Sequence, residues 1–278
     1  MKHRSIIIGT FWVLLFLSSL FIFSCKKNKE IDLQPDVSAA NGYVAIEDEM
    51  KYVFDMLVKA QKDDLLWSSG HSHIDSAWVT AEISQHKLFF DYNSICPDSI
   101  VRNGRIEATL SGPLFLKGTI ISVIFLEYHV DVNKYEGTDT IKNLGVNTSG
   151  QWIFSASMNN GKIIQYIITG SINYQVQNQF LVDSVSVLSG NDFSYLIKGS
   201  VSGICSTGNA FEGLIRDSLT SRLSCHWIDS GVTKIKVTAA NYTEGTIDFI
   251  KDDGCSEKMI YNFGNNIFYV LKLKRYLP

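Results

Sequence analysis

The sequence predicts a mainly β protein, built as an antiparallel sandwich or a curled, barrel-like sheet and preceded by one amphipathic helix. Three observations predict this class. Apolar residues recur at spacings of three and four within residues 43–62. From residue 77 onward apolar and polar residues alternate, with turn residues roughly every ten positions. The 278 residues include only four prolines, which suits hydrogen-bonded ladders because proline cannot donate to them.

The first 24 residues are typical of a secretory signal peptide. Lys2 and Arg4 form a positive end, and residues 6–23 are largely apolar. At the end of this run, the residues Ile22, Ser24 and Cys25 resemble the lipobox of bacterial lipoproteins. This resemblance implies that Cys25 becomes the first mature residue and carries the lipid, so that the membrane is a partner through the anchor. An uncleaved transmembrane anchor is the alternative, and both place the rest of the chain outside the cytoplasm.

The remaining chain divides into three parts. Residues 25–42 are expected to be the lipidated cysteine and a tether, residues 43–76 a helix and loop, and residues 77–278 an antiparallel β domain. Acidic residues near the start of the helix and Lys59 and Lys62 near its end favour the helix dipole. We expect its apolar face to pack on the sheet. That face consists of Ile46, Met50, Val53, Phe54, Leu57 and Val58.

The β domain is expected to follow its alternating runs. They span residues 77–83, 87–92, 106–110, 120–132, 152–158, 163–176, 193–201, 211–215, 232–238, 246–250 and 267–273. Residues 159–161, 207–209 and 264–266 contain Asn and Gly, which accept positive φ, and are expected to form hairpin turns. Four cysteines remain after lipidation, and an even number in an exported chain favours two disulfides of open connectivity. They are Cys96, Cys205, Cys225 and Cys255.

Short blocks of the β domain together resemble a family of uncharacterised exported lipoproteins from Bacteroidetes-type bacteria. The blocks are residues 96–98 (CPD), 102–106 (RNGRI), 111–112 (SG), 135–138 (YEGT), 141–145 (IKNLG), 199–203 (GSVSG), 225–231 (CHWIDSG), 246–249 (TIDF) and 254–255 (GC). The resemblance implies a β-rich lipoprotein of the cell envelope, anchored at the outer membrane. It supplies no catalytic residues.

A second resemblance concerns modification. Exported proteins of such bacteria are O-glycosylated at Asp followed by Ser or Thr and then a small or aliphatic residue. The matching hydroxyl residues here are Ser76, Ser99, Thr140, Ser184 and Ser218. We expect one or two of them to be used.

The search for chemistry yields candidates of three kinds. His71 and His73 alternate on a possible strand and are weak candidates for sharing a metal ion, and a polar loop between helix and first strand is the favoured interpretation. Glu107, Glu127, Asp131, Glu136 and Asp248 are candidate carboxylates for glycoside hydrolysis. Aromatic residues are candidates for a sugar-stacking face or for the core, and they are Trp67, Trp78, Tyr92, Tyr128, Trp152, Tyr166, Tyr174, Tyr195 and Trp227.

Two functions are consistent with these patterns. The first is a lipid-anchored cell-envelope protein that binds a glycan or protein partner or has a structural role at the surface. The alternative is an exported, polysaccharide-directed hydrolase with paired carboxylates. A net charge of −3 offers no basic field for nucleic acid, and no motif predicts a cofactor. Two acids in one pocket would favour the hydrolase, whereas a flat face with exposed aromatic residues would favour binding.

Overall fold

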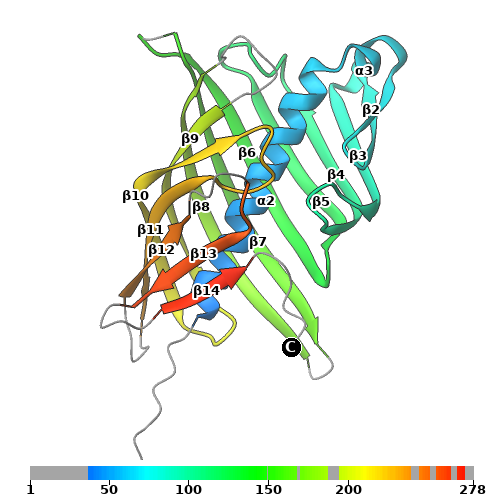
Figure 1. The fold of residues 1–278 in the computed structure, drawn as a ribbon. Helices are drawn as coiled ribbons and strands as arrows, with labels where there is room; N and C mark the ends of the chain where they lie inside the picture. The colour runs from blue at the N-terminus through cyan, green and yellow to red at the C-terminus, as the bar shows by residue number, and fades with distance from the viewer. Residues whose placement is uncertain are drawn as a thin grey trace, which may run out of the picture. The chain divides into compact units, whose positions relative to one another are not determined.

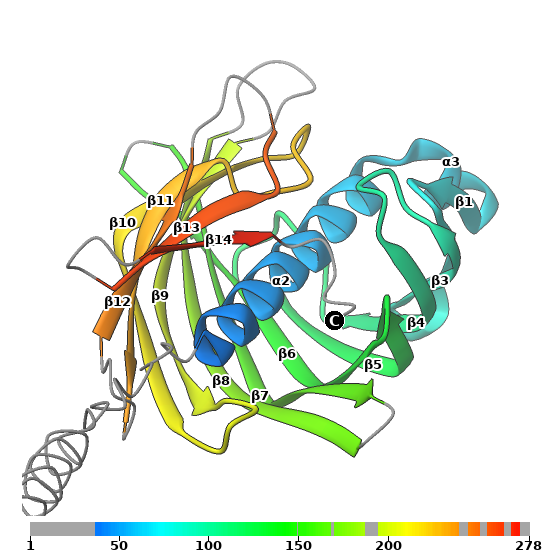
Figure 2. The same ribbon diagram turned by 60° about the horizontal axis from the view of Figure 1, so that its bottom comes forward.

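Helix α2 (Ser38–Lys62) lies against the concave side of a curled antiparallel sheet (Figures 1 and 2). The structure, a computed structural model, describes residues 37–148, 150–167, 170–186, 194–238, 244–250, 255–263 and 268–272, without the side chains of residues 159, 165–186, 268 and 272. All of these residues belong to one unit, residues 35–278. The predicted class, a mainly β, curled sheet preceded by one helix, is confirmed.

In the described residues the sheet has 14 strands in the order of the sequence, with β1 and β14 at its edges. Consecutive strands pair in antiparallel fashion throughout. The strands are β1 (His71–Ile74), β2 (Ala77–Glu82), β3 (Lys87–Ile95), β4 (Val101–Leu110), β5 (Ile120–Val130), β6 (Asn133–Val146), β7 (Trp152–Ile167), β8 (Gly170–Ser186), β9 (Ser194–Ile204), β10 (Ala210–Arg222), β11 (Ser230–Val237), β12 (Glu244–Phe249), β13 (Lys258–Asn262) and β14 (Phe268–Lys272). Two short helices, α3 (Asp64–Ser69) and the 3₁₀ turn η1 (Ile83–Gln85), flank β1 and β2.

Helix α2 is buried on nearly all sides rather than on one apolar face. Its polar residues Glu47, Asp48, Glu49, Lys51 and Asp55 are buried together with its apolar ones. The reason is that the sheet curls around the helix, so that side chains from both halves of the sheet contact it. The contacts include Tyr52–Tyr92 on β3, Glu49–Arg102 on β4, Glu49–Tyr128 on β5, Phe54–Phe154 on β7, Asp55–Tyr195 on β9 and Tyr43–Thr233 on β11.

The boundaries of α2 differ from the expectation at one end only. The helix ends at Lys62 as predicted, but it begins at Ser38, so residues 38–42 of the expected tether are helical. Asp63 ends α2 and caps α3, because its carboxylate accepts a hydrogen bond from the backbone N–H of Leu66 at 2.8 Å. Gly70, at φ 81°, ends α3 in the left-handed conformation that glycine adopts readily.

Most predicted runs correspond to strands, with three differences. The run expected at residues 163–176 is divided between the end of β7 and the start of β8. Strands β1, β6 and β13 and helix α3 were not expected. The turn expected at residues 159–161 lies inside β7, where the ladder with β8 shifts register between Met158 and Gly161. The turn at residues 207–209 does connect β9 and β10, and residues 264–266 lie outside the described part of the chain.

A β-bulge couples β4 to β5. The register shifts between Asn103 and Arg105, and Gly104 adopts φ 91°. A Cβ atom at this position would lie 2.0 Å from the backbone oxygen of Glu127 on β5. Glycine is therefore required here both by the backbone conformation and by the close approach of the neighbouring strand.

Candidate functional site

Cys25, the predicted lipid attachment site, lies outside the described residues. No helix in the described part of the chain combines the length and the apolar character that a membrane crossing needs. The prediction of lipidation therefore stays a prediction.

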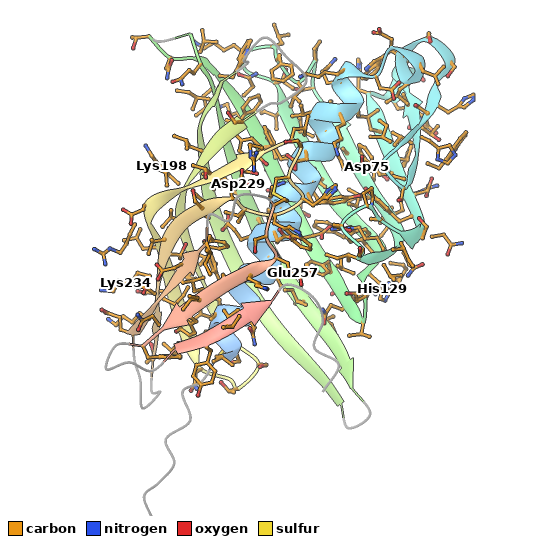
Figure 3. The ribbon with its side chains drawn as sticks, viewed as in Figure 1. Asp75, His129, Lys198, Asp229, Lys234 and Glu257 are labelled. Carbon is orange, nitrogen blue, oxygen red and sulfur yellow. A yellow bond between two sulfur atoms is a disulfide. The ribbon has the colours of Figure 1, made fainter. Side chains whose placement is uncertain are left out.

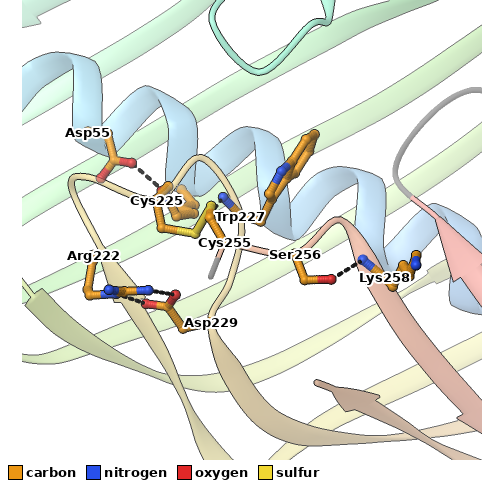
Figure 4. The surroundings of a disulfide bond; sticks show 9 residues. Asp55, Arg222, Cys225, Trp227, Asp229, Cys255, Ser256 and Lys258 are labelled. Carbon is orange, nitrogen blue, oxygen red and sulfur yellow. Dashed lines mark hydrogen bonds and ion pairs between the residues drawn. A yellow bond between two sulfur atoms is a disulfide. The ribbon is translucent and has the colours of Figure 1, made fainter. Parts of the chain in front are cut away.

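Cys225 and Cys255 form a disulfide, which joins the connection between β10 and β11 to the segment before β13 (Figure 4). The ammonium group of Lys51 on α2 donates a hydrogen bond to the backbone oxygen of Cys225 at 2.7 Å. The disulfide loop is thereby held against the helix.

The expected second disulfide is not formed, which corrects the prediction that all four cysteines pair. Cys96 and Cys205 are both buried thiols. Cys96 follows β3, with its sulfur 3.9 Å from the hydroxyl of Tyr52, whereas the thiol of Cys205 follows β9 and donates to the backbone oxygen of Asn209 at 3.1 Å. The sulfur of Cys96 therefore faces helix α2, whereas that of Cys205 contacts its own turn.

His71 and His73 lie on the exposed side of β1, so the segment is a strand, as the metal hypothesis assumed, and not a polar loop. Both rings contact Trp78 on β2, with ring centroids 5.2 and 4.6 Å away. Asp75 is bound instead by the ammonium group of Lys59 at 2.5 Å, and His129 on β5 lies well apart from Asp75 in Figure 3. In the described residues no three His, Cys, Asp or Glu side chains come together as a metal site would require.

The candidate glycosylation residues differ in their surroundings. Ser99 is exposed in the turn after β3, and Ser76 and Ser218 are partly exposed. Thr140 is also partly exposed, but its neighbour Asp139 is fully buried. The side chain of Ser184 lies outside the described residues. Modification itself stays a prediction at all five positions.

A buried network of charges ties α2 to the sheet. Arg102 on β4 donates to Asp98 at 2.6 Å and to Glu49 on α2 at 3.4 Å, and Tyr128 donates to Glu49 at 2.5 Å. The guanidinium carbon lies 3.7 Å from the ring centroid of Tyr52. Burial raises the pKa of Glu49, and the nearby guanidinium of Arg102 opposes this effect.

A second buried group lies along the same helix. Lys51 binds Asp55 at 2.5 Å, and the hydroxyl of Tyr195 on β9 donates to Asp55 at 2.8 Å. Burial also raises the pKa of Glu47 to about 8, and the nearby Tyr43 opposes this effect. Neither of the pockets described below is lined by these groups. Their role is to position the helix within the sheet.

The strongest candidate site is a mostly apolar pocket of about 330 Å³ beside helix α3, here called the α3 pocket. It is formed by three separate segments: the α2–α3 corner, the β2–β3 turn and the β4–β5 connection. Its lining residues are Gln61, Trp67, Glu82, Ile83, His86, Lys87, Leu88, Leu110, Gly112 and Pro113. The volume and the apolar lining are typical of a small-molecule pocket.

Hydrogen bonds fix the walls of the α3 pocket. The indole N–H of Trp67 donates to the backbone oxygen of Ala60 at 2.9 Å. The side-chain oxygen of Gln61 accepts from the backbone N–H of Leu114 at 2.9 Å, which holds the β4–β5 connection against the end of α2. The backbone N–H of Leu110 donates to the carbonyl of His86 at 2.8 Å. These bonds hold the three segments in place, so the pocket is formed before a ligand binds.

The mouth of the α3 pocket carries exposed apolar side chains. Trp67 is 36% exposed and Ile83 is 59% exposed, and both line the pocket. Leu116, 56% exposed, lies next to Gly112 of the lining. His86 adopts φ 55°, an uncommon conformation for a residue with a side chain, where η1 ends. Large apolar side chains gathered at a pocket mouth are typical of a binding site.

A second, more polar pocket of about 560 Å³ lies along β7, β9 and β10. Lys162 and Glu212 are the charged residues of its described lining. Neither pocket brings two carboxyl groups together among the described residues, since each has one acid in its lining. The candidate carboxylates Glu107 and Glu127 are bound by Lys87 and Lys134.

The aromatic candidates separate into core and surface residues. Tyr92, Tyr128, Tyr195 and Trp227 are buried, and Trp152 is partly buried. Trp67 and Trp78 are exposed at 36% and 41%. The side chains of Tyr166 and Tyr174 lie outside the described residues. Trp67 was a candidate from the sequence, but the pocket was not predicted. Asp63 and Gly70 are the cap residues that indicate helix α3, which carries Trp67.

Comparison with protein-family models, with curated proteins and with solved structures finds no match.

Proposed function

We propose that this chain is a lipid-anchored protein of the cell envelope, at the outer membrane, that binds a ligand with an apolar body in the α3 pocket. The observation that carries the proposal is the apolar pocket itself, with Trp67 and Ile83 exposed at its mouth. Water-exposed apolar surface of this kind is stabilised when a ligand covers it. The rest of the fold supports the site by fixing its three segments.

The polar groups of the lining indicate how such a ligand would be oriented. Glu82, His86 and Lys87 come from the β2–β3 turn, so they lie on one wall. Lys87 is already paired with Glu107 on β4 at 2.5 Å. A ligand would place its apolar body against Leu88 and Leu110 and its polar end toward this wall.

Export and anchoring belong to the same proposal and rest on the lipobox-like segment ending at Cys25. The Cys225–Cys255 disulfide supports an exported location, because disulfides persist in oxidising compartments. A Cys25→Ala variant should lose the lipid and appear as a soluble or unprocessed form in membrane fractionation. Unchanged mature size and membrane retention would remove the anchor from the proposal.

The hydrolase alternative receives less support. It needs two carboxyl groups in one cleft, and each of the two pockets described here contributes one acid from its described lining. The α3 pocket instead has the composition of a binding pocket.

The pocket is tested with the apolar fluorophore N-phenyl-1-naphthylamine and the chain from residue 26 onward. We expect saturable binding that Ile83→Glu weakens by about tenfold, because a charge at the mouth must be desolvated when the probe enters. Ile95→Glu is the matched control, since Ile95 is 66% exposed at the far end of β3. Equal binding by both variants, or no saturable binding by the unmodified chain, would refute the proposal.

A further inference from the structure

The outer face of β1–β4 carries a straight row of polar and aromatic side chains. His73 pairs with Trp78 on β2, Trp78 pairs with Asp91 on β3, and Asp91 pairs with Arg105 on β4. Because these are direct cross-strand partners, their side chains lie side by side on one face of the sheet. The strands concerned are the cyan to blue-green ones in Figure 1.

The row is open to solvent. Trp78 is 41% exposed, and the side chains of Arg105 and Asp91 are 44% and 36% exposed. His71 and His73 flank the indole, with ring centroids 5.2 and 4.6 Å from that of Trp78. An indole held in place by its neighbours yet exposed to water loses little conformational freedom when a partner stacks on it.

Four charged side chains of this face form two ion pairs. Arg105 makes two hydrogen bonds to Asp91, at 2.6 and 3.0 Å, and Lys87 binds Glu107 at 2.5 Å. The ring of Phe89 lies beneath both cations, 4.9 Å from the Arg105 guanidinium carbon and 6.0 Å from the Lys87 nitrogen. The paired charges create little net field, and Glu82 on β2 adds a negative charge near Arg105, so the face has no positive field that would select an anionic partner.

We infer that this row is a binding site for a neutral oligosaccharide. A sugar ring has an apolar C–H face, which suits the indole of Trp78, and hydroxyl groups that suit the Arg105–Asp91 pair. Three strand spacings separate His73 from Arg105, about 14 Å, which accommodates more than one sugar ring. None of the four residues of the row, which are His73, Trp78, Asp91 and Arg105, lines the α3 pocket, and the inference does not depend on the function proposed for that pocket.

The test is calorimetric titration of the full-length protein, solubilised in mild detergent, with neutral hexasaccharides of glucose (β-1,4 and α-1,4), mannose and xylose. Hexagalacturonate is the charged control. We expect at least one neutral hexasaccharide to bind, and Trp78→Ala to weaken that binding by about tenfold. Arg105→Gln is a second variant, which removes the guanidinium while leaving the exposed indole in place. Trp67→Ala is the matched control, because Trp67 is similarly exposed but lines the α3 pocket.

Three results would overturn the inference. They are no binding by any neutral hexasaccharide, binding that neither Trp78→Ala nor Arg105→Gln weakens, and tighter binding of hexagalacturonate than of the neutral sugars. Binding of N-phenyl-1-naphthylamine should be unchanged in Trp78→Ala, so that failure of this site and failure of the α3 pocket are separate outcomes.

Discussion

The guanidinium of Arg102 on β4 stacks on the ring of Tyr52 in helix α2, with 3.7 Å between the guanidinium carbon and the ring centroid. Arg102 is fully buried and is also bound by Asp98 and Glu49. One side chain therefore joins the helix to the strand that encloses it. The cation is retained at this depth because two carboxylates and an aromatic face replace the water it loses.

Removal of this cation is predicted to be costly. We expect Arg102→Ala to lower the free energy of unfolding by about 3–5 kcal/mol, because it leaves Asp98 and Glu49 buried without their counter-charge. Arg105→Ala breaks the exposed pair with Asp91 and should cost about 1 kcal/mol or less. Urea unfolding followed by circular dichroism measures both, and equal losses would contradict the structural role of Arg102.

The raised pKa of Glu47 predicts that the free energy of unfolding falls as pH rises from 5 to 8. Burial raises the pKa of Glu47 from its ordinary 4.5 to about 8 in the folded chain. The unfolded chain releases this proton near pH 4.5 while the folded chain keeps it until about pH 8. The contribution is therefore complete below pH 4.5 and is lost as pH rises, by up to about 4 kcal/mol between pH 5 and pH 8.

The side chain in Glu47→Gln is neutral at every pH, so this variant should lack this part of the pH dependence. Its free energy of unfolding should therefore rise relative to that of the unmodified chain as pH rises. Unfolding in urea at pH 5, 6.5 and 8 measures the difference. Glu244→Gln is the control, because Glu244 is exposed and pairs with Lys234 at the surface. A constant difference between Glu47→Gln and the unmodified chain at all three pH values would show that Glu47 ionises normally.

The disulfide is predicted to contribute about 3.5 kcal/mol, since Cys225 and Cys255 are 30 residues apart and the bond restricts the unfolded chain. The double variant Cys225→Ala, Cys255→Ala should lose this amount in urea unfolding. A reductant should lower the stability of the unmodified chain to that of the double variant and leave the variant unchanged. If a reductant still lowered the stability of the double variant, the stabilisation would have to come from a disulfide between Cys96 and Cys205.

Gly118 and Gly104 have nearly the same φ, so variants at these two positions distinguish the cost of backbone strain from the cost of a steric clash. Gly118 has φ 90° and nothing within 4 Å of an added Cβ, so Gly118→Ala should cost about 1–2 kcal/mol through the backbone alone. Gly104 has φ 91°, and its added Cβ would meet the Glu127 backbone at 2.0 Å. Gly104→Ala should therefore cost clearly more, and thermal unfolding of the two variants compares them. Similar losses would mean that β4 and β5 separate easily at the bulge.

The sequence predicted strands where the inner and outer faces differ in polarity. In β3 the inward residues Leu88, Phe90 and Tyr92 are all apolar or aromatic, so the alternation is clear. In β6 the inward positions include Asp139 and Asn143, both buried, and these interrupt the alternating pattern. Asn143 donates a hydrogen bond to the backbone oxygen of Leu114 at 2.7 Å, a contact between distant segments that a local pattern does not contain.

The enclosure of α2 could not be predicted in the same way. Glu47, Asp48 and Glu49 look like a solvent-facing start of an amphipathic helix, and only the closure of distant strands buries them. The α3 pocket has the same origin, because Trp67, Ile83 and Pro113 meet from three separate segments. His71 and His73 share the exposed face of β1, as the metal hypothesis assumed, since alternation is a local property of a strand.

The most direct test of the proposed function is native mass spectrometry of the protein isolated from its own cell envelope. We predict an apolar molecule bound to the unmodified chain and to Ile95→Glu but lost from Ile83→Glu, because Ile83 lies at the mouth of the α3 pocket and Ile95 does not line it. An unmodified chain that carries no such molecule and takes up no N-phenyl-1-naphthylamine, or an Ile83→Glu variant that retains the molecule fully, would contradict the account.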